Sequence, residues 1–245
     1  MGIIWGQRMY GRVDRFAGSH VATRFFHFYY LPLIPLSSWL VLEEKEQGQF
    51  IGTQVPLQLR SVLLAWLRVA SVIAGIGAIS AVANALNPGA HWGIGELIGS
   101  IIYAAAALAF GLYAFARLGK LSAQEKAARV VYSDFAGRFV DVALLGDGRG
   151  AVKQRATEEL DRHLVKHATA SYRDAPQTSW RQIATRPDVR DVPLLRAALT
   201  RCRVEWSEAS GEDRRTLEVD HATILSNLQA AHPEIMQLDQ FELRG

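Results

Sequence analysis

The sequence predicts an α+β membrane protein with a small N-terminal β-rich module, a two-helix transmembrane hairpin and a C-terminal all-α cytoplasmic domain. Three observations predict it. Two long apolar runs lie back to back in the middle of the chain, segments rich in β-branched and aromatic residues precede them, and amphipathic helical patterns follow. We expect the β-rich module over 1–58, the hairpin over 61–117 and the helical domain over 120–245.

The N-terminal module contains three segments with the composition of strands, at His20–Tyr30, Ser38–Glu44 and Gln49–Leu57. Pro32 and Pro35 lie between the first two, and we expect them to break the ladder and force a turn or crossing. Aromatic residues fall on both faces of the first strand. Because sixty residues form a weak core alone, we expect these faces to pack within the protein; the membrane surface or a partner is the alternative.

The two apolar runs are Ser61–Leu86 and Leu97–Ala116, and we expect helices over 61–86 and 97–116. The second run has no charge and the first has only Arg68. Each is long enough for the ~20 residues that a hydrocarbon core of ~30 Å requires. Both lie far from the N-terminus, which argues against a cleavable signal sequence. A buried core helix is the alternative, but two such runs joined by a short turn favour membrane spanning.

Positive charge lies at the outer ends of the hairpin. Arg60 and Arg68 are at the start of the first run, Arg117 and Lys120 follow the second, and the connection Asn87–Glu96 has no Lys or Arg. The positive-inside rule therefore predicts a multi-pass protein of the bacterial inner (cytoplasmic) membrane with both termini in the cytoplasm.

Two features inside the predicted helices have alternative interpretations. Arg68 either marks a functional contact within the membrane or extends its side chain to the cytoplasmic headgroups, and its place near the helix start favours the second. Small residues at four-residue spacing predict close helix packing, within the hairpin or between copies; they are Ala70, Ala74 and Ala78, with either Ala105 and Ala109 or Ala107 and Gly111.

Composition excludes several classes of protein. The net charge is only +3, so no basic surface for nucleic acid is indicated. The single cysteine, Cys202, rules out an internal disulfide and a multi-cysteine zinc site.

Four N-terminal segments together carry a resemblance: YGRVD at Tyr10–Asp14, VATRFF at Val21–Phe26, PLIPLSSWLV at Pro32–Val41 and VPLQLRSVLLAWLR at Val55–Arg68. They resemble uncharacterised bacterial two-helix membrane proteins with an N-terminal β module that contains PLIP. The strand-then-PLIP pattern is also similar to modules associated with a zinc ribbon. The paired cysteines of such a ribbon are absent here, so no zinc site is carried over. Over roughly the first 140 residues, the resemblance implies a cytoplasmic β module on a two-helix anchor, and no activity.

The region after the hairpin has the pattern of a helical domain. Ser122 with Glu125 forms a capping-box pattern that opens a helix through about Asp134. Further amphipathic helices are expected at Ala151–Tyr172, Val192–Ala209 and Asp213–His232, with a short one around Trp180 in the connection Tyr172–Pro193. Apolar faces place five residues of the Val192–Ala209 helix and five of the last in the core; they are Leu194, Leu195, Ala198, Leu199 and Cys202, and Leu217, His221, Ile224, Leu225 and Leu228. Cys202 is thus expected as a core residue, with a nucleophile as the alternative.

The segment GDGRGA places Gly146, Gly148 and Ala151 in the pattern G-x-G-x-x-G/A, after an apolar run and before a helix. In a dinucleotide-binding unit such residues bring pyrophosphate to a helix N-terminus. No second strand follows, however, so a glycine-rich turn that starts a helix is the favoured interpretation.

Glu159, His163 and His167 are spaced by four and share one helical face. Such a set can chelate zinc, but the H-E-x-x-H pattern is absent. A solvated polar stripe with a Glu–His contact is favoured. The pair Asp220 and His221 lacks the turn that exposes a nucleophilic serine.

Two hypotheses about function follow. In the first, the chain is a membrane-anchored accessory or scaffold subunit whose cytoplasmic modules contact other membrane or cytoplasmic proteins. In the second, it is a membrane-bound enzyme that binds a phosphate-bearing ligand or a metal in the C-terminal domain. We favour the first, with the lipid bilayer and other proteins as partners and with no cofactor; the oligomeric state is open.

Overall fold

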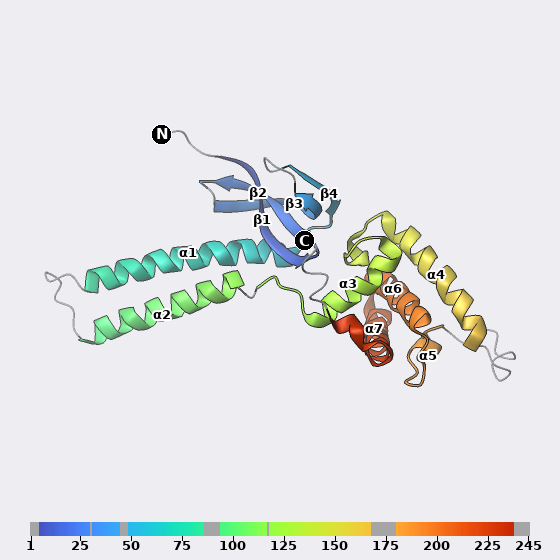
Figure 1. The fold of residues 1–245 in the computed structure, drawn as a ribbon. Coiled ribbons are helices and arrows are strands. Elements are labelled where there is room, and N and C mark those ends of the chain that lie inside the picture. The colour runs from blue at the N-terminus through green and yellow to red at the C-terminus, as the bar shows by residue number, and fades with distance from the viewer. Residues whose placement is uncertain are drawn as a thin grey trace. The chain divides into compact units, whose positions relative to one another are not determined.

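The computed structural model describes residues 5–29, 31–44, 49–85, 94–116, 118–167 and 180–237, and divides the chain into two compact units. The first unit comprises Met1–Arg15 and His20–Lys120, and the second comprises Phe16–Ser19 and Leu121–Gly245. The predicted β-rich module and the predicted helical hairpin thus lie in one unit. The α+β class is confirmed, because the chain combines a four-stranded antiparallel sheet with helices (Figure 1).

The sheet of the first unit has the strand order β1-β2-β3-β4. The strands are β1 (Trp5–Phe16), β2 (Ser19–Phe28), β3 (Leu31–Glu44) and β4 (Phe50–Val55). The last three correspond to the predicted strands, whereas β1 was not predicted. Its sequence, WGQRMYGRVDRF, contains two glycines and an aspartate, which are depleted in strands.

The prediction that Pro32 and Pro35 break the ladder is wrong, because both lie inside β3. They pair with β2, opposite His27 and Phe25, where the register shifts twice. On its other side β3 pairs with β4 only over Ser38–Glu44. The prolines therefore occupy a stretch of β3 that pairs with a described strand on one side only, and edge strands tolerate proline.

Helix α1 (Leu59–Ala85) begins against the sheet, held by a chain of buried hydroxyl groups. Ser61 Oγ donates to the carbonyl oxygen of Gly11 at 2.6 Å and accepts from Thr23 Oγ1 at 2.9 Å. Thr23 Oγ1 in turn lies 2.7 Å from Ser38 Oγ, which caps the N–H of Gln58 at 2.9 Å. Three strands and the start of α1 thus share one buried hydrogen-bond network.

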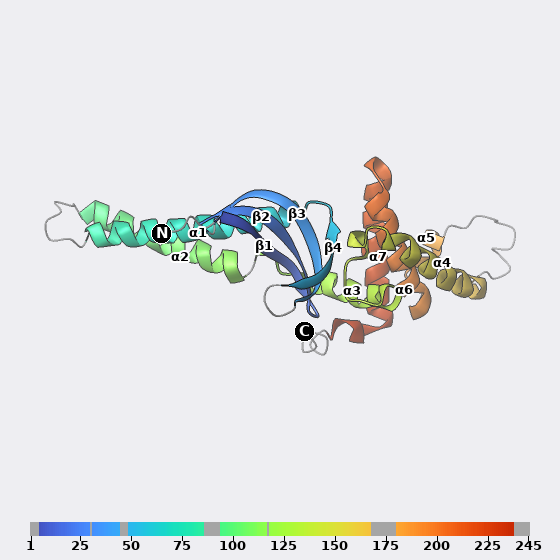
Figure 2. The same ribbon diagram turned by 90° about the horizontal axis from the view of Figure 1, so that it is seen from above.

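Aromatic packing extends this contact along the next turns of α1. Phe25 is fully buried against Val62 and Ala65, with Tyr10 edge-on at 5.8 Å. The indole N–H of Trp66 donates to the carbonyl oxygen of Pro32 at 3.0 Å. Figures 1 and 2 show the sheet over the N-terminal part of α1, while the rest of α1 and helix α2 (Ile94–Ala116) extend beyond it. One aromatic face of β2 therefore packs within the unit, as expected.

Helices α1 and α2 pack along a narrow seam of small residues. Its members are buried or partly buried and recur every three or four positions; they are Ser71, Ala74 and Ala78 in α1, and Ser100, Ala104, Ala107, Gly111 and Ala114 in α2. Of the two predicted rows in α2, Ala107 with Gly111 faces the partner helix, whereas Ala105 and Ala109 are exposed, as is Ala70. Small side chains let two helix backbones approach closely.

The second unit is a helical domain. Its elements are α3 (Ala123–Ala136), η2 (Val142–Leu144), α4 (Gly148–His167), α5 (Trp180–Ala184), α6 (Val192–Glu208), α7 (Gly211–Ala231) and η4 (Pro233–Met236). Each predicted helix is present. The end of the predicted helix Ala151–Tyr172, at residues 168–172, and the predicted connection at residues 173–179 lie outside the described residues. Ser122 caps α3, and the full capping box with Glu125 is formed, as predicted.

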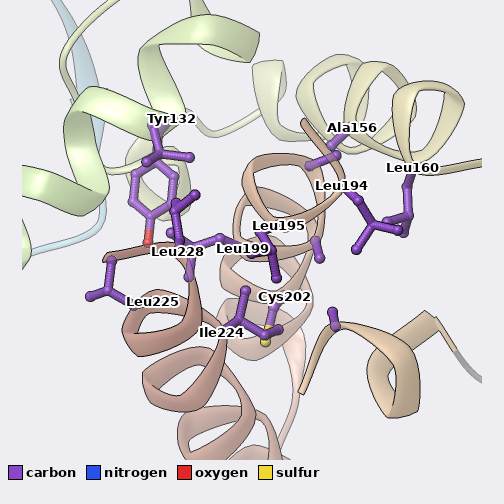
Figure 3. Close-up of a cluster of buried hydrophobic side chains, with 14 of the residues drawn as sticks. Tyr132, Ala156, Leu160, Leu194, Leu195, Leu199, Cys202, Ile224, Leu225 and Leu228 are labelled. Carbon is purple, nitrogen blue, oxygen red and sulfur yellow. The ribbon is translucent and has the colours of Figure 1, made fainter. Parts of the chain in front are cut away.

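Helix α6 is the centre of this domain and contacts α3, α4, α5 and α7. Figure 3 shows its leucines between Tyr132 of α3, Leu160 of α4 and Leu228 of α7. The predicted core positions of α6 are all buried, and of those in α7 only His221 is partly exposed. The turn Phe16–Ser19 belongs to this unit, where the rings of Phe16 and Phe139 meet edge-to-face at 5.9 Å.

Gly11 should be irreplaceable where α1 meets the sheet. Its φ is +64°, and a Cβ added there would lie 1.9 Å from the carbonyl oxygen of Ser61. We expect Gly11→Ala to destabilise the first unit by about 2 kcal/mol or more, since both backbone strain and a backbone clash are introduced. Hydrogen exchange of β1 and α1 peptides measures the loss. Gly75→Ala is the control, because nothing lies within 4 Å of its added Cβ; equal protection in the two variants would contradict the prediction.

Candidate functional site

The glycine-rich segment starts helix α4 and forms no dinucleotide-binding turn. Gly148 is the first residue of α4, and the preceding apolar run forms the 3₁₀ turn η2. No strand occurs in the described residues from Leu121 onward. The carbonyl oxygen of Gly146 accepts from the backbone N–H and the guanidinium of Arg149, and Ala151 is an exposed residue in the first turns. The geometry fits the turn that the sequence favoured.

His163 is held between two carboxylates and uses both ring nitrogens. Its Nδ1 lies 3.0 Å from Asp191 Oδ2, and its Nε2 lies 3.2 Å from Glu159 Oε1. The expected Glu–His contact is therefore formed, with Asp191, the N-cap of α6, as a further partner. The side chain of His167 lies outside the described residues. No cluster of three His, Cys, Asp or Glu side chains suited to a metal occurs in the described part of the chain.

A buried polar cluster joins α3, η2, α6 and α7 in the helical domain. Tyr132 Oη lies 2.6 Å from His221 Nε2. Arg203 donates to both oxygens of Asp141, at 2.9 and 2.5 Å, and stacks over the ring of Trp206 at 4.5 Å. Trp206 also packs against the His221 ring at 5.5 Å. The five side chains connect helices that are distant in the sequence.

The electrostatics of this cluster indicate a structural role. Burial, together with the charge of Arg203, lowers the pKa of His221 from 6.5 to about 4, so the imidazole is neutral at pH 7. Burial alone would raise the pKa of Asp141, but the charge and hydrogen bonds of Arg203 bring it below its usual value. Burial raises the pKa of the Tyr132 hydroxyl well above 10. The protonated Tyr132 phenol is hydrogen-bonded to the neutral His221 imidazole, and Arg203 is paired with Asp141. None of these four groups has a pKa suited to proton transfer near pH 7.

Cys202 and Asp220 fit the same interpretation. Burial raises the pKa of the Cys202 thiol to about 12, and the thiol donates to the carbonyl oxygen of Leu217. Since the thiolate is the reactive form, Cys202 is a core residue, as predicted. Asp220 pairs with Arg181 rather than with His221, so no catalytic triad is assembled.

A basic hollow of about 490 Å³ lies on the sheet of the first unit. Arg8, Arg12, His20, Arg24 and Glu44 are among its lining residues. The guanidinium of Arg12 pairs with Glu44 at 2.8 Å, and burial lowers the pKa of His20 to about 4. The charge of Arg12 is therefore compensated, and His20 is neutral at pH 7.

The largest unexplained feature is exposed apolar surface, and it forms the candidate functional site. The outward faces of α1 and α2 carry large aliphatic and aromatic side chains; among them, Ile79 is 73% exposed and Leu108 is 65% exposed. Only 28% and 18% of the residues in the most apolar windows of α1 and α2 are buried. By length and composition, each helix could cross a membrane. A soluble core helix would be mostly buried, and these two are not.

A second apolar surface lies on the sheet. It is the stretch of β3 that β4 leaves unpaired, which we call the β3 edge, and Leu33, Ile34 and Leu36 are among its exposed members. Large exposed apolar patches in soluble domains mark interaction sites. Sequence reasoning missed this edge, because it placed the PLIP segment in a turn. The alternation of exposed leucines with prolines was the available signal.

No protein-family model, no curated protein and no solved structure matches this chain. The interpretation therefore depends on the geometry of its own residues.

The His221 environment predicts how the stability of the helical domain depends on pH. The pKa of His221 is about 6.5 in the unfolded chain and about 4 in the folded domain. Between these pH values, the unfolded state therefore binds more protons at His221 than the folded state does. The contribution of neutral His221 to the free energy of unfolding is fully present above pH 6.5 and is lost as the pH falls toward 4. Over this range, the unfolding equilibrium constant rises by up to about tenfold per pH unit. We expect His221→Gln to flatten this dependence, measured by hydrogen exchange of α6 and α7 peptides between pH 4 and 7.

Tyr132→Phe is the matched control for this experiment. It removes the hydrogen-bond partner of His221 but keeps the imidazole, so the pH dependence should remain. A steep dependence that persists in His221→Gln would show that another group is responsible.

Proposed function

We propose that this chain is a membrane-anchored accessory or scaffold subunit, held by α1 and α2 in a bacterial inner membrane, that binds other proteins through its cytoplasmic parts. The observation that carries the proposal is the exposed apolar surface of two helices that pack together along a seam of small residues and leave their outward faces uncovered. Exposing such an apolar surface to water is unfavourable for a stable monomer, whereas a hydrocarbon environment accommodates it.

Helix dimensions support the anchor. Helix α1 has 27 residues, which is about 40 Å and longer than a ~30 Å hydrocarbon core. The sheet covers its first turns, through Trp66. From Arg68 to Ala85 the helix spans about 26 Å, and the 23 residues of α2 span about 34 Å. The remaining apolar length of each helix thus approximates the hydrocarbon core.

Charge supports the orientation. Arg60 lies at the start of α1, where the sheet covers it, Arg68 lies just beyond that cover, and Lys120 follows α2. Arg60 donates to the carbonyl oxygen of Lys120 at 3.2 Å, so these two positions are close together. Positive residues at this end favour the cytoplasmic side, which supports a cytoplasmic location for the sheet and the helical domain. Arg117 and the connection at residues 86–93 lie outside the described residues.

The accessory role is supported by the β3 edge and by the character of the polar clusters. Leu33, Ile34 and Leu36 form an exposed apolar edge of the kind that accepts a partner strand or side chains. In the helical domain, the buried groups Tyr132, Asp141, Arg203 and His221 are held in hydrogen-bonded pairs. A phosphate-binding or metal-dependent enzyme would require a convergence of groups at Gly146–Ala151 or at His163 that the geometry does not favour.

The anchor predicts sensitivity to charge on the exposed helix faces. A carboxylate near the middle of a membrane helix costs about 3 kcal/mol. We expect the double variant Ile79→Asp with Leu108→Asp to lose resistance to alkaline extraction from membranes, whereas the unchanged chain stays in the membrane pellet. Val219→Asp in α7 is the control, because Val219 is equally exposed at 65% but lies in the helical domain. A fully extractable unchanged chain would refute the anchor.

The accessory role predicts stoichiometric partners. The chain is purified from its native membrane in mild detergent, and the bound proteins are identified by mass spectrometry. We expect Ile34→Asp with Leu36→Asp to reduce the recovery of a partner at least about tenfold, as loss of an apolar anchor of an interface does. Val165→Asp, at an isolated exposed position of α4, should leave recovery unchanged. A chain that purifies alone with a bound nucleotide or metal would refute the accessory role.

A further inference from the structure

A hollow of about 610 Å³ lies in the first unit between β1, the start of β3 and the exposed side of α1. We call it the β1–α1 groove. Its lining falls into two classes. Arg12, Arg15 and Arg68 provide the cationic part, and the remaining residues are mostly apolar, with aliphatic residues of α1 as the largest group among them. None of its described lining residues is acidic.

Two of the three arginines carry charge that no described carboxylate neutralises. Arg12 pairs with Glu44 and is therefore compensated. Arg15 and Arg68 form no ion pair within the described chain, and Arg68 Nε is buried without a hydrogen-bond partner. The Arg68 guanidinium lies over the ring of Phe115 at 5.4 Å, which fixes it at the groove. Two uncompensated guanidiniums in one hollow favour an anionic occupant.

The other wall of the groove is apolar and continues along α1. Val72, Ile73 and Ile76 line it and are 51%, 59% and 61% exposed. Tyr29 and Leu31, at the end of the sheet where β2 turns into β3, complete the wall, and Figure 1 shows this end directed along α1. A free phosphate or nucleotide would leave this wall exposed to water. The wall therefore favours an occupant with a hydrocarbon portion next to its anionic group.

The depth of the groove agrees with such an occupant. Arg68 lies about 14 Å from the start of α1, just beyond the turns that the sheet covers. In the proposed anchor this is the level of the cytoplasmic headgroups, where basic residues attract anionic lipids. The aliphatic wall then extends from the headgroup level into the hydrocarbon region.

We propose that the β1–α1 groove binds an anionic glycerophospholipid, with the headgroup phosphate between Arg15 and Arg68 and an acyl chain along Val72–Ile76. The inference rests on the proposed membrane anchor. It adds a specific lipid site to that anchor, in which the lipid bridges the sheet and the first apolar helix.

The test uses the full chain in nanodiscs with equal amounts of phosphatidylglycerol and phosphatidylcholine of identical acyl chains. Lipids retained after transfer to detergent are counted by native mass spectrometry. We expect phosphatidylglycerol to be retained preferentially, and Arg15→Gln and Arg68→Gln each to reduce this preference about fivefold. Arg8→Gln is the matched control: it removes the same charge from the same sheet, but Arg8 lines the basic hollow and not the groove.

Failure of the inference is distinguishable from failure of the anchor. A chain that enters nanodiscs but retains both lipids equally overturns the lipid site and leaves the anchor intact. An equal effect of Arg8→Gln and Arg68→Gln also overturns it, because the preference would then be a general charge effect. If millimolar glycerol phosphate displaces the lipid as well as phosphatidylglycerol does, the apolar wall has no part and the assignment is wrong. A chain that does not enter nanodiscs refutes the anchor and the site together.

Discussion

The contact between Gly11 and Ser61 determines the architecture of the first unit. It requires a glycine, because any Cβ at position 11 would meet the Ser61 carbonyl group. The Ser61 hydroxyl bridges that position to Thr23 and, through it, to Ser38. Buried hydroxyl groups must find partners, so this network fixes the start of α1 against β1, β2 and β3. The sheet alone would be a small four-stranded layer with a weak core, and the first turns of α1 supply the missing cover.

A second constraint follows from this contact. Once the sheet covers α1 through Trp66, the cover ends at Arg68, and the helix continues with exposed aliphatic residues. The same position brings an uncompensated guanidinium next to Phe115 and Arg15. A helix whose one face is covered up to a basic residue, and which then continues with exposed aliphatic residues, is what a membrane boundary would require. The proposed anchor and the proposed lipid site both derive from where the sheet ends on the helix.

The helical domain depends on a different principle. Leucines of α6 share one core with residues of α3, α4 and α7 (Figure 3). The polar cluster around His221 and Arg203 adds hydrogen bonds between elements far apart in the sequence. Its ionisable groups are satisfied by one another. Such a cluster specifies one packing of the helices and does not offer reactive groups to a substrate.

The sequence by itself determined the elements whose signals are local. Apolar length placed α1 and α2, the capping box at Ser122 placed α3, and helical periodicity placed Cys202 and its neighbours in the core. It could not determine the strand β1 or the path of the PLIP segment, because strand pairing joins residues that are not neighbours in the sequence. Only the observed pairing of β3 shows that Pro32 and Pro35 lie where β4 leaves the strand unpaired. From the sequence alone, Arg68 is a single charge near the start of an apolar helix. Only the tertiary structure brought Arg15 and Phe115 to it, since a groove is made by three segments whose spacing along the chain carries no sign of their contact.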